Sequence, residues 1–163
     1  MDLRLKGKTA IVTASSGGLG EYAARALAAE GVNLVMFARS ADTLRAKAAD
    51  ITKLHGVRVL PVEGDMRKTA DVNRLLAETE REFGGVDILV LNTGRPPVPM
   101  REVLDETEDE RWQEAYETQL RGAIRVVGKV APLLVARGWG RIVGITSASV
   151  KQPMTKHGLS TVF

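Results

Sequence analysis

A run of small residues between Thr13 and Gly20 is the first feature with a clear chemical use. It reads Thr-Ala-Ser-Ser-Gly-Gly-Leu-Gly and joins a short apolar run to an alanine-rich segment. Glycines let backbone amides approach a pyrophosphate, and the start of a helix adds free N–H groups and partial positive charge. Glycine turns without a ligand are also common, because many strand–helix connections need a residue at positive φ. We predict contacts to a dinucleotide from Thr13, Ser15, Ser16, Gly18, Leu19 and Gly20.

Two polar residues, Arg39 and Ser40, follow the second apolar run. An NAD site usually has an acidic residue about twenty positions beyond its glycines, which binds the ribose 2′-hydroxyl. Here Ala38, Arg39 and Ser40 stand at that place, and an arginine suits a 2′-phosphate instead. The sequence therefore favours NADP(H) over NAD(H) as the cofactor. The alternative is a solvated arginine at the start of the next helix.

The third and fourth apolar runs also end in residues that can bind a nucleotide. Gly64, Asp65 and Met66 follow the third run, and the Asp65 carboxylate can accept a hydrogen bond from an adenine amino group. Asp65 can equally cap the following helix or make a local turn. After the fourth run, Asn92 can bridge neighbouring strands through its amide, and Gly94 lets a ring pass close to the backbone, although plain turn chemistry explains both. We predict cofactor contacts from Asp65, Met66, Asn92, Thr93 and Gly94.

Hydroxyl groups gather after the fifth apolar run, at Thr146, Ser147 and Ser149. A hydroxyl at the carboxyl edge of a sheet can donate a hydrogen bond to a substrate carbonyl. Most serines at such places only satisfy nearby backbone groups. These residues are therefore candidates for substrate binding that need support from the rest of the chain.

These clusters need an architecture that brings them together. Each follows a strand-length run that is apolar at successive positions, which is typical of a strand covered on both faces. The five predicted strands are Thr9–Thr13, Asn33–Ala38, Arg58–Glu63, Asp87–Asn92 and Arg141–Thr146. Segments with helical spacing lie between them, and a glycine follows each segment. The predicted helices are Leu19–Glu30, Asp42–Leu54, Asp71–Phe83 and Glu108–Ala136, the last with a kink expected near Pro132.

The alternation of strands and helices predicts an α/β fold, a doubly wound, Rossmann-like parallel sheet with right-handed crossovers. Ligands of such sheets bind beyond the carboxyl ends of the strands, where the strand order reverses. All five polar clusters belong at that edge. The chain contains no linker, repeat or low-complexity tract, so residues 1–163 are predicted to form a single dinucleotide-binding domain.

The composition is typical of a globular protein and argues against several other classes. Hydrophobic residues make up 44% and charged residues 26%, and no stretch approaches the roughly 18 apolar residues of a membrane-spanning helix. The net charge of +3 is spread along the chain, so no nucleic-acid or membrane partner is expected. Cysteine is absent, which excludes disulfides and thiolate metal sites, and no metal site is predicted. The N-terminus lacks a signal-peptide core, so a cytoplasmic location is expected.

The five clusters, in this order, resemble the short-chain dehydrogenase/reductase family over nearly the whole chain. The first signature of that family, Thr-Gly-x-x-x-Gly-x-Gly, is matched by Thr13–Gly20, with Ala14 in place of the first glycine. Its asparagine signature is matched by Asn92–Gly94, and its adenine-contacting aspartate by Asp65. The loop from Arg95 and the stretch after Ser147 look like a branch labelled 3-oxoacyl-acyl-carrier-protein reductase-like.

The resemblance implies hydride transfer between a nicotinamide and a small carbonyl or alcohol substrate, with a 3-oxoacyl thioester as one candidate. It implies that Ser147 orients the substrate carbonyl and that a tyrosine is the general acid/base, with its pKa lowered by a lysine four residues further on. An asparagine in the long helix supports a proton relay. Family members assemble as dimers and tetramers, so a homodimer or homotetramer is expected.

The sequence departs from this pattern at the residues that transfer protons. Ser160 stands where the tyrosine is expected, and the lysine would fall just beyond Phe163. Gln119 corresponds to the helix asparagine. The only tyrosines, Tyr22 and Tyr116, belong by position to the cofactor helix and the long helix, and neither is expected to substitute.

Lys151 and His157 are weaker alternatives near Ser147. Lys151 can donate to a substrate oxygen or be a solvated loop lysine, and His157 is expected to face solvent. Family members usually continue well past this point, so the chain is expected to be the N-terminal part of a longer protein. The C-terminal strands would then be missing, which leaves an open sheet edge. Three hypotheses remain: an NADP(H)-dependent oxidoreductase, a catalytically impaired NADP-binding or regulatory protein on the same scaffold, and a mainly structural partner in an oligomer that packs through the long helix Glu108–Ala136.

Overall fold

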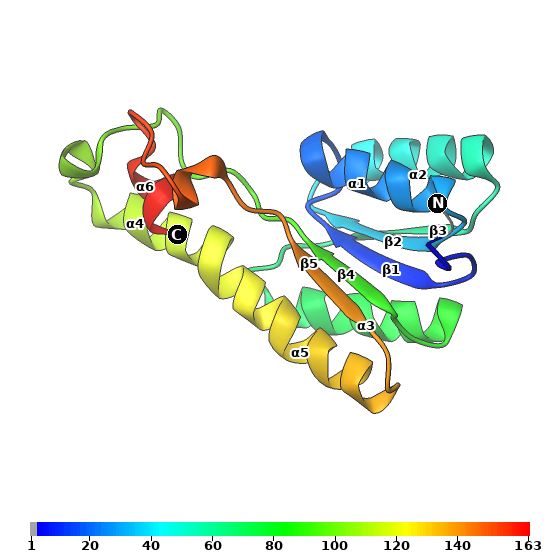
Figure 1. The fold of residues 1–163 in the computed structure, drawn as a ribbon. Coiled ribbons are helices and arrows are strands. Elements are labelled where there is room, and N and C mark those ends of the chain that lie inside the picture. Colours follow the sequence, from blue (N-terminus) through cyan, green and yellow to red (C-terminus); the bar gives the residue numbers. More distant parts are fainter. Residues whose placement is uncertain (1–2) are drawn as a thin grey trace.

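The computed structural model describes residues 3–163 and contains a five-stranded parallel sheet with helices on both faces (Figure 1). The strands run in the order β3-β2-β1-β4-β5, and each neighbouring pair is parallel. The strands are β1 (Thr9–Thr13), β2 (Asn33–Ala38), β3 (Val59–Glu63), β4 (Ile88–Leu91) and β5 (Arg141–Gly144). The predicted doubly wound, Rossmann-like α/β fold is confirmed.

Four long helices cover the two faces of the sheet. On one face lie α1 (Gly18–Ala29) and α2 (Ala41–His55), and on the other lie α3 (Thr69–Phe83) and α5 (Gly122–Ala136) (Figure 1). Alternation along β1 directs Val12 into the core cluster shared with α1 and α2, and Ile11 into the cluster shared with α3 and α5. Both side chains are fully buried. This burial on both sides explains why the inner strands read as continuous apolar runs.

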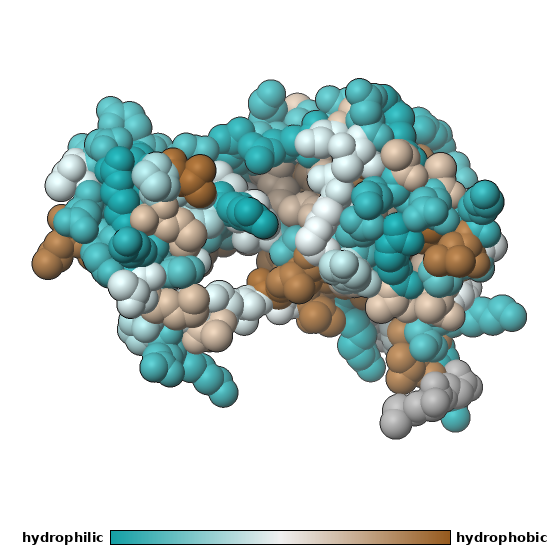
Figure 2. Space-filling view, turned by 90° about the horizontal axis from the view of Figure 1, so that it is seen from above, coloured by the Kyte–Doolittle hydropathy of each residue, from teal (hydrophilic) through white to brown (hydrophobic). Residues whose placement is uncertain are grey.

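The outer strand, β5, differs from the prediction of a strand covered on both faces. All four of its residues are exposed, Ile142 by 42% and Val143 by 52%. β5 pairs with β4 only, so within residues 3–163 its other side forms the open edge of the sheet. Figure 2 shows apolar residues in several separate places on this face of the molecule, and one of these groups lies between its two parts. An apolar run therefore predicted this strand correctly and its burial wrongly.

The long helix predicted over Glu108–Ala136 is divided into three segments. It begins as α4 (Asp109–Ala115), passes through a π-helical segment, η2 (Tyr116–Arg121), and continues as α5. The irregular hydrogen bonding thus lies at η2, whereas α5 continues past Pro132 to Ala136. Single π-helical turns in longer helices often occur at functional sites.

A second group of elements lies beyond the carboxyl edge of the sheet, around α4 (Figure 1). It comprises η1 (Val103–Asp105), η3 (Ala148–Val150) and α6 (Gly158–Val162). The ring of Phe163 packs edge-on against Trp112 and Tyr116, with ring centroids 6.1 and 6.0 Å apart. The Gly158 N–H donates to the Arg101 carbonyl at 2.9 Å. The ring contacts attach the C-terminal segment to α4 and η2, and the hydrogen bond attaches it to the loop that follows β4.

A buried ion pair fixes that loop. The Arg111 Nε lies 2.6 Å from the Glu106 Oε2, and the Glu106 side chain is only 1% exposed. The same guanidinium donates to the Pro99 carbonyl at 2.7 Å. The pair therefore holds the proline-rich segment that follows β4 in one position.

Candidate nucleotide-binding cleft

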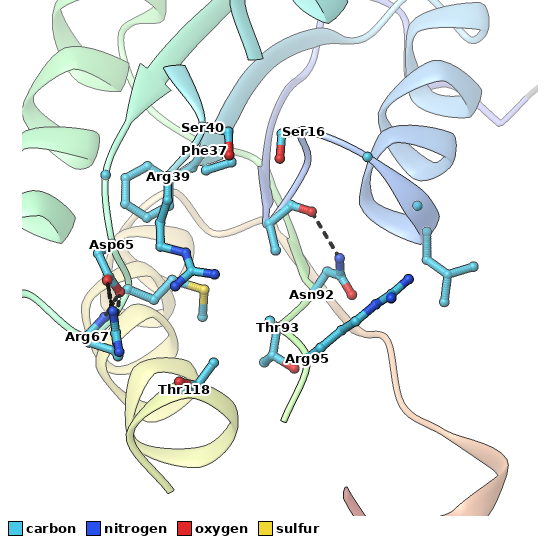
Figure 3. Close-up of a pocket in the computed structure, with 18 residues that line it drawn as sticks. Ser16, Phe37, Arg39, Ser40, Asp65, Arg67, Asn92, Thr93, Arg95 and Thr118 are labelled. Carbon is cyan, nitrogen blue, oxygen red and sulfur yellow. Dashed lines mark hydrogen bonds and ion pairs between the residues drawn. The ribbon is translucent and has the colours of Figure 1, made fainter. Parts of the chain in front are cut away.

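A cleft of about 570 Å³ lies at the carboxyl edge of the sheet. Its walls come from the segments that follow β1, β2, β3 and β4, together with Thr118 of η2 (Figure 3). The strand order reverses between β1 and β4, because the chain first builds outward through β2 and β3 and then returns to the other side of β1. Ligands of open α/β sheets bind at this reversal point.

All but three of the residues predicted to contact a cofactor line this cleft. Those that do are Ser16, Gly18, Leu19, Arg39, Ser40, Asp65, Met66, Asn92, Thr93 and Gly94. The other three, Thr13, Ser15 and Gly20, are buried and do not belong to the lining. These three residues lie beneath the residues of the lining and pack against them.

The glycine turn leaves the start of α1 open. Gly17 is the N-cap residue, and no side chain caps the helix. The first amides of an α-helix have no acceptor within the helix, so those of α1 are available to a ligand. Ser15 is different, since its N–H donates to the Phe37 carbonyl at 3.3 Å and holds the turn against β2. An open helix start beside glycines suits an anion.

Gly20 is the position in the turn where a side chain cannot fit. A Cβ there would lie 2.5 Å from the Ala14 carbonyl oxygen and 2.9 Å from the Asn92 Nδ2. Ala14, which replaces the first glycine of the signature, has a φ of +47°. That region is costly for any residue with a Cβ. The turn therefore accepts alanine at its first position and requires glycine at its last.

Asn92 ties the turn to the end of β4. Its Nδ2 donates to the Ala14 carbonyl at 3.2 Å (Figure 3). The Thr13 hydroxyl donates to the Asn92 carbonyl at 2.7 Å and accepts from the Asn92 N–H at 2.9 Å. The predicted bridge between neighbouring strand ends is confirmed, and it explains why Thr13 is buried.

Arg39 lies on the wall formed by the end of β2 (Figure 3). It is exposed, and within residues 3–163 it makes no hydrogen bond or ion pair. Ser40 is the N-cap residue of α2, but its side chain makes no capping hydrogen bond. A cation and a hydroxyl on this wall are thus both available to a ligand.

Asp65 is engaged by Arg67. The Arg67 Nε and Nη2 lie 2.9 and 2.7 Å from the Asp65 Oδ2, and the Arg67 N–H donates to the Oδ1 at 2.9 Å. Burial alone would raise the pKa of Asp65, but the hydrogen bonds from Arg67 together with the positive charges of Arg67 and Arg39 hold that pKa below its usual value. The alternative of a local turn is confirmed. Asp65 does not cap α3, whose N-cap residue is Lys68. The adenine contact remains a prediction.

Sequence reasoning missed several residues of the lining. They are Ala14, Gly17, Phe37, Ala38, Gly64, Arg67, Arg95 and Thr118. A signal existed for Arg95, which directly follows the asparagine signature. Gly64 is needed because a Cβ there would collide with the Phe37 ring. Thr118 had no signal, because it reaches the cleft from η2, far along the chain.

The predicted catalytic residues Ser147, Lys151 and Ser160 do not line the cleft. Ser147 is exposed after β5, and its Oγ accepts from the Ser149 N–H at 3.2 Å. Lys151 is exposed in the turn after η3. Ser160 lies in α6, where its carbonyl accepts from the Ser149 Oγ at 3.5 Å. Their roles remain predictions.

Gln119 is the fourth catalytic candidate and lies in η2, next to Thr118 of the lining. Its Nε2 is buried and has no hydrogen-bond partner in the described part of the chain. Because buried amides are normally paired, a bound water or ligand would gain a hydrogen bond here. Tyr22 is 72% exposed on α1, and Tyr116 packs against Phe163, so neither tyrosine lines the cleft.

Within residues 3–163 the structure contains neither a cluster of metal ligands nor a helix that could span a membrane. No three His, Asp or Glu side chains between residues 3 and 163 come together as metal ligands would. None of the helices in that range combines the length and apolar character needed to cross a bilayer.

Comparison with known proteins finds dehydrogenases and reductases among the relatives. D-beta-hydroxybutyrate dehydrogenase of Cupriavidus necator is 34% identical over 144 residues, which are 88% of this chain and 54% of that protein. A 3-oxoacyl-acyl-carrier-protein reductase of Staphylococcus epidermidis is 32% identical over 141 residues, or 86% and 56% of the two chains. The structure of L-sorbose reductase from Gluconobacter frateurii, complexed with NADPH and L-sorbose, is 34% identical with a TM-score of 0.92, covering 99% of this chain and 60% of that one.

The chain therefore spans a little over half of the length of these relatives. Residues 8–159 match the model of the short chain dehydrogenase family. The strand order and the glycine turn before α1 agree with that match. The chain belongs to the short chain dehydrogenase family.

Proposed function

We propose that this chain carries the nucleotide-binding part of an NADP(H)-dependent oxidoreductase, which transfers a hydride between a nicotinamide and a carbonyl or alcohol substrate. The observation that carries the proposal is the unpaired Arg39 in a cleft that also contains the open start of α1. The similar L-sorbose reductase is complexed with NADPH, which supports the choice of cofactor.

The residues present fit a phosphorylated dinucleotide. The amides of Gly18 and Leu19 would hold the diphosphate, and Arg39 with Ser40 would hold the 2′-phosphate. Asp65 and its neighbour Met66 would face the adenine. Thr93 and Gly94 leave a path along the backbone for the rest of the cofactor. When bound, the nicotinamide supplies or accepts the hydride.

The substrate is proposed as a small carbonyl or alcohol, with acyl compounds oxygenated at the β-carbon as the first class to test. Two of the relatives are a D-beta-hydroxybutyrate dehydrogenase and a 3-oxoacyl-acyl-carrier-protein reductase, and their names share that chemistry. Ser147 would orient the substrate oxygen, with the orphaned Gln119 amide and Lys151 as further polar groups.

Fluorescence titration with NADPH and NADH tests the cofactor assignment. We expect NADPH to bind more tightly, and Arg39→Ala to weaken NADPH about ten- to hundredfold while NADH is unchanged, since a charge-assisted hydrogen bond contributes about 1.5–3 kcal/mol. Arg45→Ala is the matched control, because Arg45 is an exposed α2 arginine that pairs with Asp42 outside the cleft. Equal affinity for both nucleotides would remove the 2′-phosphate assignment, and absence of binding would remove the cofactor.

A second candidate function is NADP binding without turnover. It is favoured by Ser160, which occupies the place of the family tyrosine, and by the absence of Ser147 and Lys151 from the lining. Steady-state assays with ketones and 3-oxoacyl thioesters separate the two candidates. NADPH oxidation that Ser147→Ala abolishes would reject the second candidate, and NADPH binding with no turnover on any substrate would reject the first.

A further inference from the structure

Arg95 is a cation in the cleft that the proposed function leaves without a role. It directly follows Gly94 and lines the same cleft as the glycine turn. Its side chain is exposed and makes no hydrogen bond or ion pair with the rest of residues 3–163. Figure 3 shows it extended on the side of Asn92 and α1, whereas Arg39, Asp65 and Arg67 lie on the other side of the cleft.

The charges of the lining are separated into two places. The carboxylate of Asp65 neutralises Arg67 through their ion pair at 2.7 Å. Within residues 3–163, Asp65 is the only acidic residue that lines the cleft, and its charge also acts on Arg39, which forms no ion pair with it. Arg95, on the other side, is the cation that no carboxylate of the lining serves. A ligand that matches this pattern carries two separate anionic groups, one for each side.

The backbone that carries Arg95 is held at both ends. On the N-terminal side, Asn92 is bonded to Thr13 and Ala14 of the glycine turn. On the C-terminal side, the Arg111 guanidinium donates to the Pro99 carbonyl at 2.7 Å. Arg95 is therefore kept beside the open start of α1, and only its side chain has to move to meet a ligand.

We propose that Arg95 binds the diphosphate of the nucleotide, as a second anionic anchor that is independent of Arg39. This inference rests on the proposed function and adds a residue to it. The Arg95 guanidinium can donate to two phosphate oxygens at once, which complements the single N–H groups of α1. A carboxylate of an acidic substrate is the other anion that Arg95 could meet. The diphosphate is favoured because Gly17, Gly18 and Leu19 share the lining with Arg95, whereas Ser147 does not.

Two half-ligands test the assignment, because each carries only one of the two anionic groups. Adenosine 2′-monophosphate has the 2′-phosphate and no 5′-phosphate, and ADP has the diphosphate and no 2′-phosphate. Calorimetric titration of Arg95→Ala should show ADP and NADPH weakened at least tenfold, with 2′-AMP changed less than twofold. Arg39→Ala should show the reverse for the two half-ligands. Arg95→Lys should recover part of the ADP affinity, because it keeps the charge and loses the two-pronged geometry.

Further outcomes separate this inference from the proposed function. In the Arg39→Ala/Arg95→Ala double variant, the two fold-losses for NADPH should multiply, since separated sites act independently. Arg45→Ala should bind every ligand as the unmodified protein does. If the protein binds NADPH but Arg95→Ala leaves ADP unchanged, the Arg95 assignment is overturned and the proposed function stands. If Arg95→Ala changes only the KM of an acidic substrate, Arg95 binds the substrate instead. If no nucleotide binds at all, both proposals fail.

Discussion

Gly20 and the Asn92 amide meet where the glycine turn enters α1, and the contact leaves no space for a methyl group. We expect Gly20→Ala to displace the Asn92 side chain, to lower the free energy of unfolding by about 1–3 kcal/mol and to weaken NADPH at least tenfold. The measurements are thermal unfolding and nucleotide titration.

Gly128→Ala is the matched control for that change. Gly128 is also in a helix, α5, and nothing lies within 4 Å of the Cβ it would gain. Removing a helical glycine at an open site should raise the free energy of unfolding by about 0.5–1 kcal/mol and leave NADPH affinity unchanged. A Gly20→Ala variant that bound NADPH normally would contradict the proposed role of the turn.

At the scale of single residues, the sequence predicts which strand a residue follows, but it does not predict the direction of the side chain. Thr13 is predicted as a contact, and its side chain is buried beneath the turn because its hydroxyl bonds to the Asn92 backbone. Its contact to a cofactor stays a prediction. Arg67 was missed because its place in the lining depends on the Asp65 turn. Direction depends on local backbone geometry, which residue types alone do not specify.

At the scale of elements, the Glu106–Arg111 pair is the clearest test of how the loop after β4 is held. Hydrogen bonds from Arg111 lower the pKa of the Glu106 carboxyl below its usual value. A lowered pKa in the folded protein means that the pair stabilises the fold fully above the unfolded pKa, about 4.3, and that this contribution is lost as pH falls through the folded pKa.

We therefore expect Glu106→Gln to lower the Tm at pH 7 by roughly 3–6 °C. This is the shift that follows from losing a hydrogen bond between charged groups that contributes about 1.5 kcal/mol to the free energy of unfolding. The difference from the unmodified protein should shrink as the pH is lowered below about 4. Glu108→Gln is the control: it removes the Arg101 partner from a half-exposed ion pair, which should cost little. A Tm difference that did not depend on pH would mean that packing, and not charge, holds the loop.

Elements differ in how far the sequence predicts them. The inner strands were predicted because burial on both faces leaves a continuous apolar pattern. The kink expected near Pro132 stays a prediction, and α5 continues past that residue to Ala136. The π-helical segment η2 was not predicted, since a π-helical turn has no residue signature comparable to proline. The apolar run of β5 wrongly predicted burial on both faces, whereas the open sheet edge that was expected beside the missing C-terminal strands is observed at β5.

At the scale of the whole molecule, the exposed surfaces bear on assembly. On α5, Val126, Val130 and Leu134 are buried against the chain's own sheet, so these residues are not free to pack against a second copy. Ile124 and Val135 of the same helix are exposed, as is the open edge at β5. A homodimer or homotetramer remains a prediction.

We expect residues 1–163 to self-associate through the β5 edge, because an unpaired apolar edge strand favours pairing with another copy. Sedimentation velocity should show a weight-average mass that rises with concentration. Val143→Lys, which places a charge on β5, should reduce that rise. Val103→Lys, at a similarly exposed valine in η1, should not. A constant monomer mass for the unmodified chain would remove this prediction.

The hydrogen bonds among Thr13, Ala14 and Asn92 have a thermodynamic consequence for the whole chain. They close the base of the crevice while the protein folds, so the loss of backbone freedom at that base is already complete when a nucleotide arrives. An incoming dinucleotide should need to order only a few arginine rotamers. Because the binding site is already formed, we expect the nucleotide to associate rapidly. Differences in affinity among variants should then appear mainly in the rate constant of nucleotide dissociation.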